Sequence, residues 1–128
     1  MPIRTHSTLA EVKEQFTKMG AAITAATTIS PTHQAHTITM PATDVDVDVI
    51  TAGRPGQLLV LVANGAGVGE INLRDSSTSG AATGANIAAG PTTSSKIVLL
   101  GEDDSCALIC DGTRWLVASS FTASADQE

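Results

Sequence analysis

The sequence predicts an all-β fold, a sandwich or barrel of about seven or eight short strands, with a short N-terminal helix in front of it. Three observations predict this fold. Apolar segments of strand length follow one another after residue 22, Gly, Pro, Asn and Asp separate them at short intervals, and only the first twenty residues show helical spacing. We therefore divide the chain into an N-terminal arm (1–22), a β-domain (23–119) and a C-terminal tail (120–128).

The N-terminal arm carries the pattern of one amphipathic helix. Thr8 and Glu11 have the spacing of a capping box, and Gly20 is a typical residue to end the helix. The apolar stripe of this helix consists of Leu9, Val12, Phe16 and Met19. A helix of this length spans about 16 Å and is marginal in water by itself, so it has to dock on another surface. Its own domain, a sibling subunit and a larger partner are all open, and we interpret the stripe as a partner-binding surface.

Seven later segments have strand patterns, at residues 36–40, 44–49, 57–63, 68–74, 96–100, 105–110 and 113–119. Segment 57–63 is continuously apolar, as expected of a strand that is covered on both faces. The dipeptide Asp111-Gly112 predicts a two-residue type I′ turn between the last two strands. In that register Trp115 lies opposite Leu108, which makes Trp115 a core residue.

The two cysteines lie in one predicted strand. The hairpin register places Val117 opposite Cys106, and Cys110 follows four residues later in the same strand. Their Cα atoms would then be about 13 Å apart, which is beyond the reach of a disulfide. We expect both cysteines to be small buried hydrophobic residues that stay reduced, in a chain made in a reducing cytoplasm.

Two segments rich in small residues interrupt the strands. The sequence Gly65-Ala66-Gly67-Val68-Gly69 resembles a dinucleotide-binding loop, but a strand pattern and not a helix follows it, so we interpret it as a glycine-rich hairpin. Segment 76–95 has a single bulky residue, Ile87, and is too long for an ordinary connection. It is therefore either a functional loop or a partly ordered one.

The composition argues against several classes of function. The chain has 7 Lys and Arg residues against 13 Asp and Glu residues, a net charge of -6, which disfavours binding to the phosphates of nucleic acid. No apolar run approaches the roughly 20 residues of a membrane-spanning helix, so we expect no membrane partner. Aromatic residues make up 2% of the chain and leave few side chains for stacking on a ligand.

The acidic residues form two clusters. Asp44, Asp46 and Asp48 alternate with valines, so a strand would place all three carboxylates on one face. The match to a calcium loop fails, because Val49 and Pro55 occupy the positions of the required Gly and Glu. This face is either a solvated surface or a carboxylate ladder that meets a basic partner or a surface cation. Residues 102–104 are a second acidic cluster, in a turn, with the same two interpretations.

No set of residues indicates catalysis. His33 and His36 lie close together without the further ligands of a zinc site, so we expect polar surface or loop-anchoring roles for them. A Gly-x-Ser-x-Gly nucleophile motif is absent, and neither cysteine lies near a histidine in the sequence. We therefore expect a protein that is not an enzyme and that uses no cofactor and no metal.

Residues 50–119 resemble the small β-domains of tailed-bacteriophage virion proteins. The stretches that carry this resemblance are ITAGRPGQLLVLVA, INLRDSS and IVLLGEDDSCALICDGTRWLVAS, with a Gly-rich turn and a small-residue loop between them. In such domains an "aG..g..l.L" strand precedes a short "l.d" strand and then a "gD...l..DGt.W" segment. The N-terminal helix is not part of the shared pattern.

The resemblance implies a capsid decoration (cement) or head-fibre protein, a class whose members are often homotrimers. The chain would then be a non-enzymatic structural protein that binds the major capsid protein on the outer capsid surface and stabilises the head. An acidic surface suits a capsid lattice with basic patches. The alternative is a receptor- or glycan-binding module of a tail fibre or head fibre, or a structural component of the tail or neck.

Overall fold

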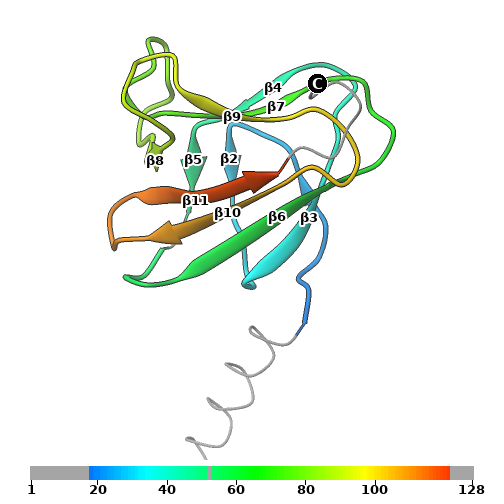
Figure 1. Ribbon diagram of the computed structural model, residues 1–128, viewed down its shortest axis with the longest axis horizontal. Helices are drawn as coiled ribbons and strands as arrows, with labels where there is room; N and C mark the ends of the chain where they lie inside the picture. The colour runs from blue at the N-terminus through cyan, green and yellow to red at the C-terminus, as the bar shows by residue number, and fades with distance from the viewer. Residues whose placement is uncertain (1–17, 52, 122–128) are drawn as a thin grey trace, which may run out of the picture.

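Figure 1 shows the computed structural model, which describes residues 18–51 and 53–121. Eleven strands lie in these ranges: β1 (Ile23–Thr24), β2 (Thr28–Ile29), β3 (Ala35–Thr39), β4 (Val45–Val47), β5 (Val49–Ile50), β6 (Leu58–Asn64), β7 (Ile71–Arg74), β8 (Ile87–Ala88), β9 (Lys96–Leu99), β10 (Ser105–Cys110) and β11 (Trp115–Phe121). The described residues contain no helix, and the predicted all-β class is confirmed. The predicted helix lies outside the described residues, except for its end at Met19.

The strands form three sheets. The largest has the order β1-β3-β6-β10-β11-β8, and β2-β5 and β4-β7-β9 form the two smaller ones. Strands β6, β10 and β11 are antiparallel neighbours, whereas β3 runs parallel to β6. In Figure 1, β2 and β5 cross behind β10 and β11, and β4, β7 and β9 close one end.

One core lies between the three sheets. Period-two alternation puts every second residue of β6 and β10 inside, as the burial of Leu59, Leu61 and Leu108 shows. The smaller sheets contribute Ile50 and Leu73 to the same cluster. Trp115 is fully buried among these residues, which confirms its predicted place in the core.

The predicted strand at 44–49 is two strands in two sheets. β4 pairs with β7, whereas β5 pairs with β2, and Asp48 lies between them. The chain changes sheets here because the N–H groups of Asp48 and Val49 both donate to the carbonyl of Thr27. The sequence also missed the two-residue strands β1, β2 and β8, which are too short to show alternation.

The β10–β11 hairpin differs from the predicted two-residue turn. Cys110 pairs with Trp115, so four residues form the loop, and the expected pairing of Trp115 with Leu108 is wrong. The Asp111 side chain determines this geometry, because its Oδ1 accepts from the N–H groups of Thr113 (2.9 Å) and Arg114 (2.7 Å).

A β-bulge changes the hairpin register a second time. The irregularity lies between Ala107 and Leu108, and beyond it Cys106 pairs with Ser120 and not with Val117 as expected. Both cysteines are free and buried on β10, as predicted.

The glycine-rich segment 65–69 is not a hairpin. It connects β6 in the large sheet to β7 in the three-stranded sheet, and β7 begins only at Ile71. A side chain at Gly67 would collide with the backbone of Met40 and Pro41, and one at Gly69 with the backbone of Thr43. The glycines therefore allow close passage of two chain segments and do not form a tight reverse turn.

Segment 76–95 has a defined structure throughout. It contains β8, which runs parallel to the start of β11, and its single bulky residue Ile87 is fully buried. Asp75 binds both ends of the segment, because its Oδ2 accepts from Ser77 N–H and its own N–H donates to the Ser95 carbonyl, both at 3.0 Å. Its Oδ1 also accepts from Ala89 N–H (2.9 Å). These contacts attach the segment to the domain, and a functional role for it stays a prediction.

Candidate functional site

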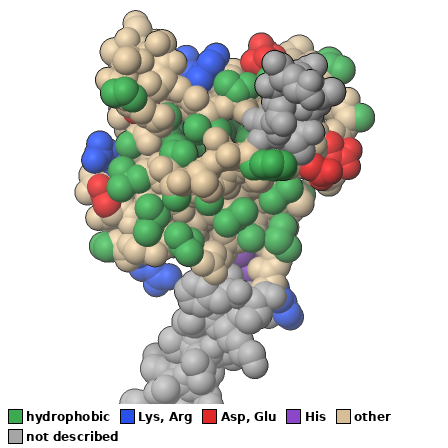
Figure 2. Space-filling model, in the orientation of Figure 1, with side chains coloured by type: hydrophobic (Ala, Val, Ile, Leu, Met, Phe, Trp, Pro, Cys, Tyr) green, Lys and Arg blue, Asp and Glu red, His purple; other side chains and the backbone are tan. Residues whose placement is uncertain are grey.

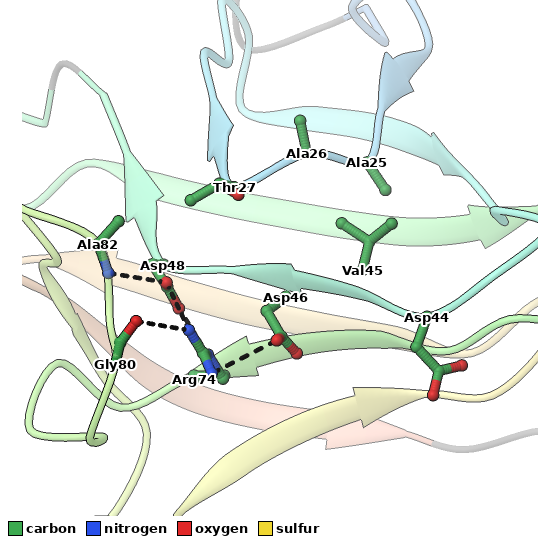
Figure 3. A pocket seen from close by; sticks show the side chains of 10 residues that line it. All are labelled: Ala25, Ala26, Thr27, Asp44, Val45, Asp46, Asp48, Arg74, Gly80 and Ala82. Carbon is green, nitrogen blue, oxygen red and sulfur yellow. Dashed lines mark hydrogen bonds and ion pairs between the residues drawn. The ribbon is translucent and has the colours of Figure 1, made fainter.

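The candidate site is an open groove of about 540 Å³ beside Arg74. Its walls are β4, the residues 25–27, and the start of the 76–95 segment at Gly80 and Ala82. Figure 3 shows Arg74 between Asp48 and Asp46, with Asp44 farther along the same stretch of chain. The groove therefore brings together all three aspartates of the predicted carboxylate face.

The parallel pairing of β4 with β7 positions these aspartates. Its register places Asp46 beside Asn72, so Asp44 and Asp48, two residues to either side of Asp46, lie opposite Glu70 and Arg74. Asp44 Oδ1 accepts from the N–H of Glu70 at 2.9 Å, and Asp46 Oδ1 accepts from Asn72 Nδ2 at 3.2 Å. Each carboxylate thus has a partner on the neighbouring segment.

Asp48 is buried, with 2% of its surface exposed. Arg74 binds it through two hydrogen bonds, Nε to Oδ1 at 2.8 Å and Nη2 to Oδ2 at 2.7 Å, and the N–H of Ala82 donates to Oδ2 at 3.0 Å. The hydrogen bonds from Arg74 are the main reason that the pKa of Asp48 is lowered, although burial opposes this shift. The expected position of Asp48 on a solvent-facing strand surface is therefore wrong.

Asp44 and Asp46 remain available to a partner. The Asp46 side chain is 46% exposed and lies 3.4 Å from Arg74 Nη1. Asp44 is exposed as well. Because Arg74 lies beside Asp46 and Asp48, its positive charge offsets part of the negative potential, and the groove is less acidic than three aligned carboxylates would be.

A second groove of about 460 Å³ lies on the other side of Asp46 and Arg74. Hydroxyl side chains from both ends of the 76–95 segment line it, together with Lys96 at the start of β9. The hydroxyl groups can donate to and accept from a polar ligand and Lys96 can donate, but no aromatic side chain of the described residues lines this groove for stacking.

The second acidic cluster does not act as a unit. Asp104 is fully buried, and its Oδ2 accepts from the N–H groups of Leu100 (2.7 Å) and Gly101 (3.2 Å). Glu102 and Asp103 are exposed in the turn. Of the two interpretations of this cluster, a surface role remains only for Glu102 and Asp103, because Asp104 stabilises the turn itself.

His36 anchors a loop, which is one of the two roles expected for the histidine pair. Its Nε2 accepts from the N–H groups of Thr32 and His33 at 3.0 Å each, and its Nδ1 lies 2.7 Å from the carbonyl oxygen of Ala21. The ring therefore carries its proton on Nδ1 and donates it to Ala21. Gly20 packs directly against this ring, which is the steric reason for a glycine there.

The residues of the predicted arm fall largely outside the described structure. Leu9, Val12 and Phe16 lie in 1–17, and Met19, the last residue of the stripe, is 52% exposed. Within 18–51 and 53–121, no three His, Cys, Asp or Glu side chains are grouped to hold a metal ion. In the same ranges the chain forms no helix with the length and apolar character needed to cross a membrane.

Sequence reasoning missed three residues that build the site: Arg74, Asp75 and Asn86. The Asn86 amide both accepts from the Ile50 N–H (3.0 Å) and donates to the Ile50 carbonyl (2.8 Å), which fixes the segment 76–95 to β5. Asp75 had a local signal, since Asp followed by Ser-Ser is typical of an Asx turn. Arg74 and Asn86 had none, because their partners are 26 and 36 residues away.

Comparison with known proteins adds no relative. No family model matches the chain, no curated protein is detectably similar to it, and no solved structure matches it. The functional argument therefore depends on the chain itself.

Proposed function

We propose that this chain is a non-enzymatic structural protein of a tailed-bacteriophage virion, a decoration protein that binds the outer capsid surface as a homotrimer. The observation that carries the proposal is the use of the buried polar residues. His36, Asp48, Asp75 and Asp104 each bind backbone groups of loops or strand ends. These hydrogen bonds make the domain rigid, and a protein that reinforces a capsid shell has to be rigid.

The proposed partner is the major capsid protein, and two surfaces of this chain suit it. The exposed carboxylates of Asp44 and Asp46 provide negative charge that steers the chain to basic patches and sets its orientation. The apolar stripe of Leu9, Val12, Phe16 and Met19 provides side chains at the spacing with which a helix binds in a groove. The resemblance of residues 50–119 to virion β-domains supports the same assignment.

Cryo-electron microscopy of the virion that contains this chain tests the location. We expect density for the β-domain at three-fold positions on the outside of the capsid. Density only at the tail tip would contradict decoration and would support the fibre alternative.

Deletion of residues 1–17 tests the arm. The deletion stops before Gly20, because the Gly20 N–H donates to the Ala35 carbonyl and belongs to the folded domain. We expect the truncated chain to keep its melting temperature and its oligomeric state but to lose binding to undecorated capsids. A melting temperature lower by many degrees would show that the stripe belongs to the core. A separate variant, Asp46→Asn in the full chain, tests the carboxylates and should weaken capsid binding at low salt more than at high salt.

The second groove gives the fibre alternative one specific observation, a polar pocket lined by hydroxyl groups and Lys96. If the chain is a glycan-binding module, the protein should bind host-cell glycans, and Lys96→Ala should abolish that binding. If the chain is a decoration protein, Lys96→Ala leaves capsid binding unchanged.

A further inference from the structure

The outward side of the six-stranded sheet is free of charge. Along β3, β6 and β10 every second side chain is buried, and the residues between them point away from the core. We call these outward side chains, with their partners on β11, the outer face. Its first row consists of Leu58, Ile109 and Leu116, which are neighbours across β6, β10 and β11.

Two further rows continue the outer face along the strands. Ala35, Val60, Ala107 and Ser119 form the central row. The third row consists of Thr37, Val62, Ser105 and Phe121, and Phe121 is 62% exposed. Every position in the three rows is apolar or a neutral hydroxyl residue.

Charged residues lie around the outer face and not on it. Asp111 and Arg114 belong to the loop at one end of β10, and Glu102 and Asp103 to the turn at its other end. Figure 2 views the molecule from this side and shows hydrophobic and neutral groups in the middle, with acidic and basic groups at the rim. An apolar surface with a polar rim is the usual anatomy of a protein interface.

The net charge of the chain indicates which partner this face suits. Each copy carries a net charge of -6, so two copies repel one another wherever acidic surfaces meet. Contact through an uncharged face avoids that repulsion. A basic partner would instead bind the exposed carboxylates of Asp44 and Asp46. These two residues lie by β4, which belongs to a different sheet. The two surfaces are therefore separate.

The size of the outer face fits the core of such a contact. Four strands about 4.8 Å apart and about 20 Å long present a projected area of about 400 Å². This equals about half of the roughly 800 Å² that each partner buries in a stable interface, so the rim has to supply the rest. The face also alternates large and small side chains, with Leu58 and Ile109 beside Ala35 and Ala107, which lets two sheets interdigitate.

We propose that the outer face is the contact surface between copies of this chain. The inference deepens the homotrimer proposed above and rests on it only for the number of copies. Other occupants, such as the chain's own N-terminal arm or the capsid protein, are outcomes of the test below.

The test is the mass of the full chain in solution, measured by sedimentation velocity at micromolar concentration without capsids. The main variant is the double substitution Leu58→Glu with Phe121→Glu, at positions that are 40% and 62% exposed and so tolerate charge without unfolding. A second variant, Ile109→Glu, puts charge between Leu58 and Leu116. The matched control is Val68→Glu, because Val68 is 88% exposed but lies outside the sheet.

We expect the wild type and Val68→Glu to sediment as oligomers, and both outer-face variants to sediment as single chains of 13.0 kDa with an unchanged β-type circular dichroism spectrum. If Ile109→Glu fails to fold, the double variant decides. A wild-type protein that sediments as a single chain of 13.0 kDa would overturn the proposal, because the arm or a capsid protein and not a second copy would then cover the outer face. An oligomer that survives the double substitution would overturn it as well. This experiment contains no capsids, so it does not test the proposed decoration function. The density in the virion tests that function separately.

Discussion

The three-stranded region and the six-stranded sheet are stabilised in different ways. In β4, β7 and β9, strands are three or four residues long, and buried charges such as Asp48 and Asp75 bind the loops beside them in place. In the large sheet, β6 and β11 are seven residues long and their backbone pairing needs no charged side chain. Short strands make too few backbone hydrogen bonds to hold long connections, so side-chain acceptors replace them. Long strands leave their outward side chains free for contact with another molecule.

The largest expected effect comes from the residue that joins the six-stranded sheet to the two-stranded sheet. Trp115 lies on β11 in the large sheet, and its Nε1 donates to the Ile50 carbonyl of β5 at 3.1 Å. Trp115→Ala should lower the free energy of unfolding by about 3–5 kcal/mol, because it leaves a cavity in the core. Chemical denaturation measures this loss. Trp115→Phe, which keeps much of the volume, should cost less, and an unchanged stability of Trp115→Ala would contradict the buried position.

The Asp48–Arg74 pair is the next test, and it probes the charged region alone. Asp48→Ala leaves Arg74, whose side chain is 20% exposed, with only Asp46 as an ion-pair partner and removes the acceptor for Ala82, so we expect a loss of about 1–3 kcal/mol in unfolding free energy. The matched control is Asp46→Asn, which removes the exposed charge beside the same arginine but keeps an acceptor oxygen for Asn72, and it should cost less than about 1 kcal/mol. Equal losses of unfolding free energy in the two variants would contradict the prediction that the buried carboxylate contributes more to stability than the exposed one.

Acid should destabilise the same region. The pKa of Asp48 is lowered by its hydrogen bonds from Arg74, and that of Asp75 by its hydrogen bond from the Ser77 hydroxyl. A lowered folded pKa gives stability that is fully present above the unfolded pKa of about 3.9 and is lost as the pH falls through the folded value. The melting temperature of the wild type should therefore drop steeply below about pH 4. Asp48→Ala should show a shallower drop, and identical pH profiles would exclude Asp48 as a source.

The smallest effect concerns the thiols of the large sheet. Burial raises the pKa of Cys106 to about 12, so its reactive thiolate is scarce at neutral pH. Neither Cys106 nor Cys110 should react with a thiol reagent in the native protein, and both should react after denaturation. Mass spectrometry measures the number of modified thiols per chain. A disulfide between them would contradict the single-strand position of both residues.

The sequence alone determined the parts of this protein that depend on local pattern. Alternation and continuous apolar runs located β3, β6, β9, β10 and β11 to within about two residues of their observed bounds, because side chains alternate between the two faces of a strand. The same patterns placed the two cysteines in one strand. Trp115 was predicted in the core from a hairpin register that is wrong, and the core position itself is confirmed.

Tertiary structure decided the features that depend on distant partners. Three aspartates with the same local pattern have different environments, because only Asp48 accepts two hydrogen bonds from Arg74 and one from Ala82, across 26 and 34 residues of chain. The same holds for segment 76–95, which Asp75 and Asn86 fix to the domain, and for the glycines that pass close to a second chain segment. The hairpin register needed the Asp111 loop and the bulge at Ala107. Each of these contacts forms only when two segments that are distant in the sequence meet in space. A sequence pattern within one segment carries no information about which other segment it meets.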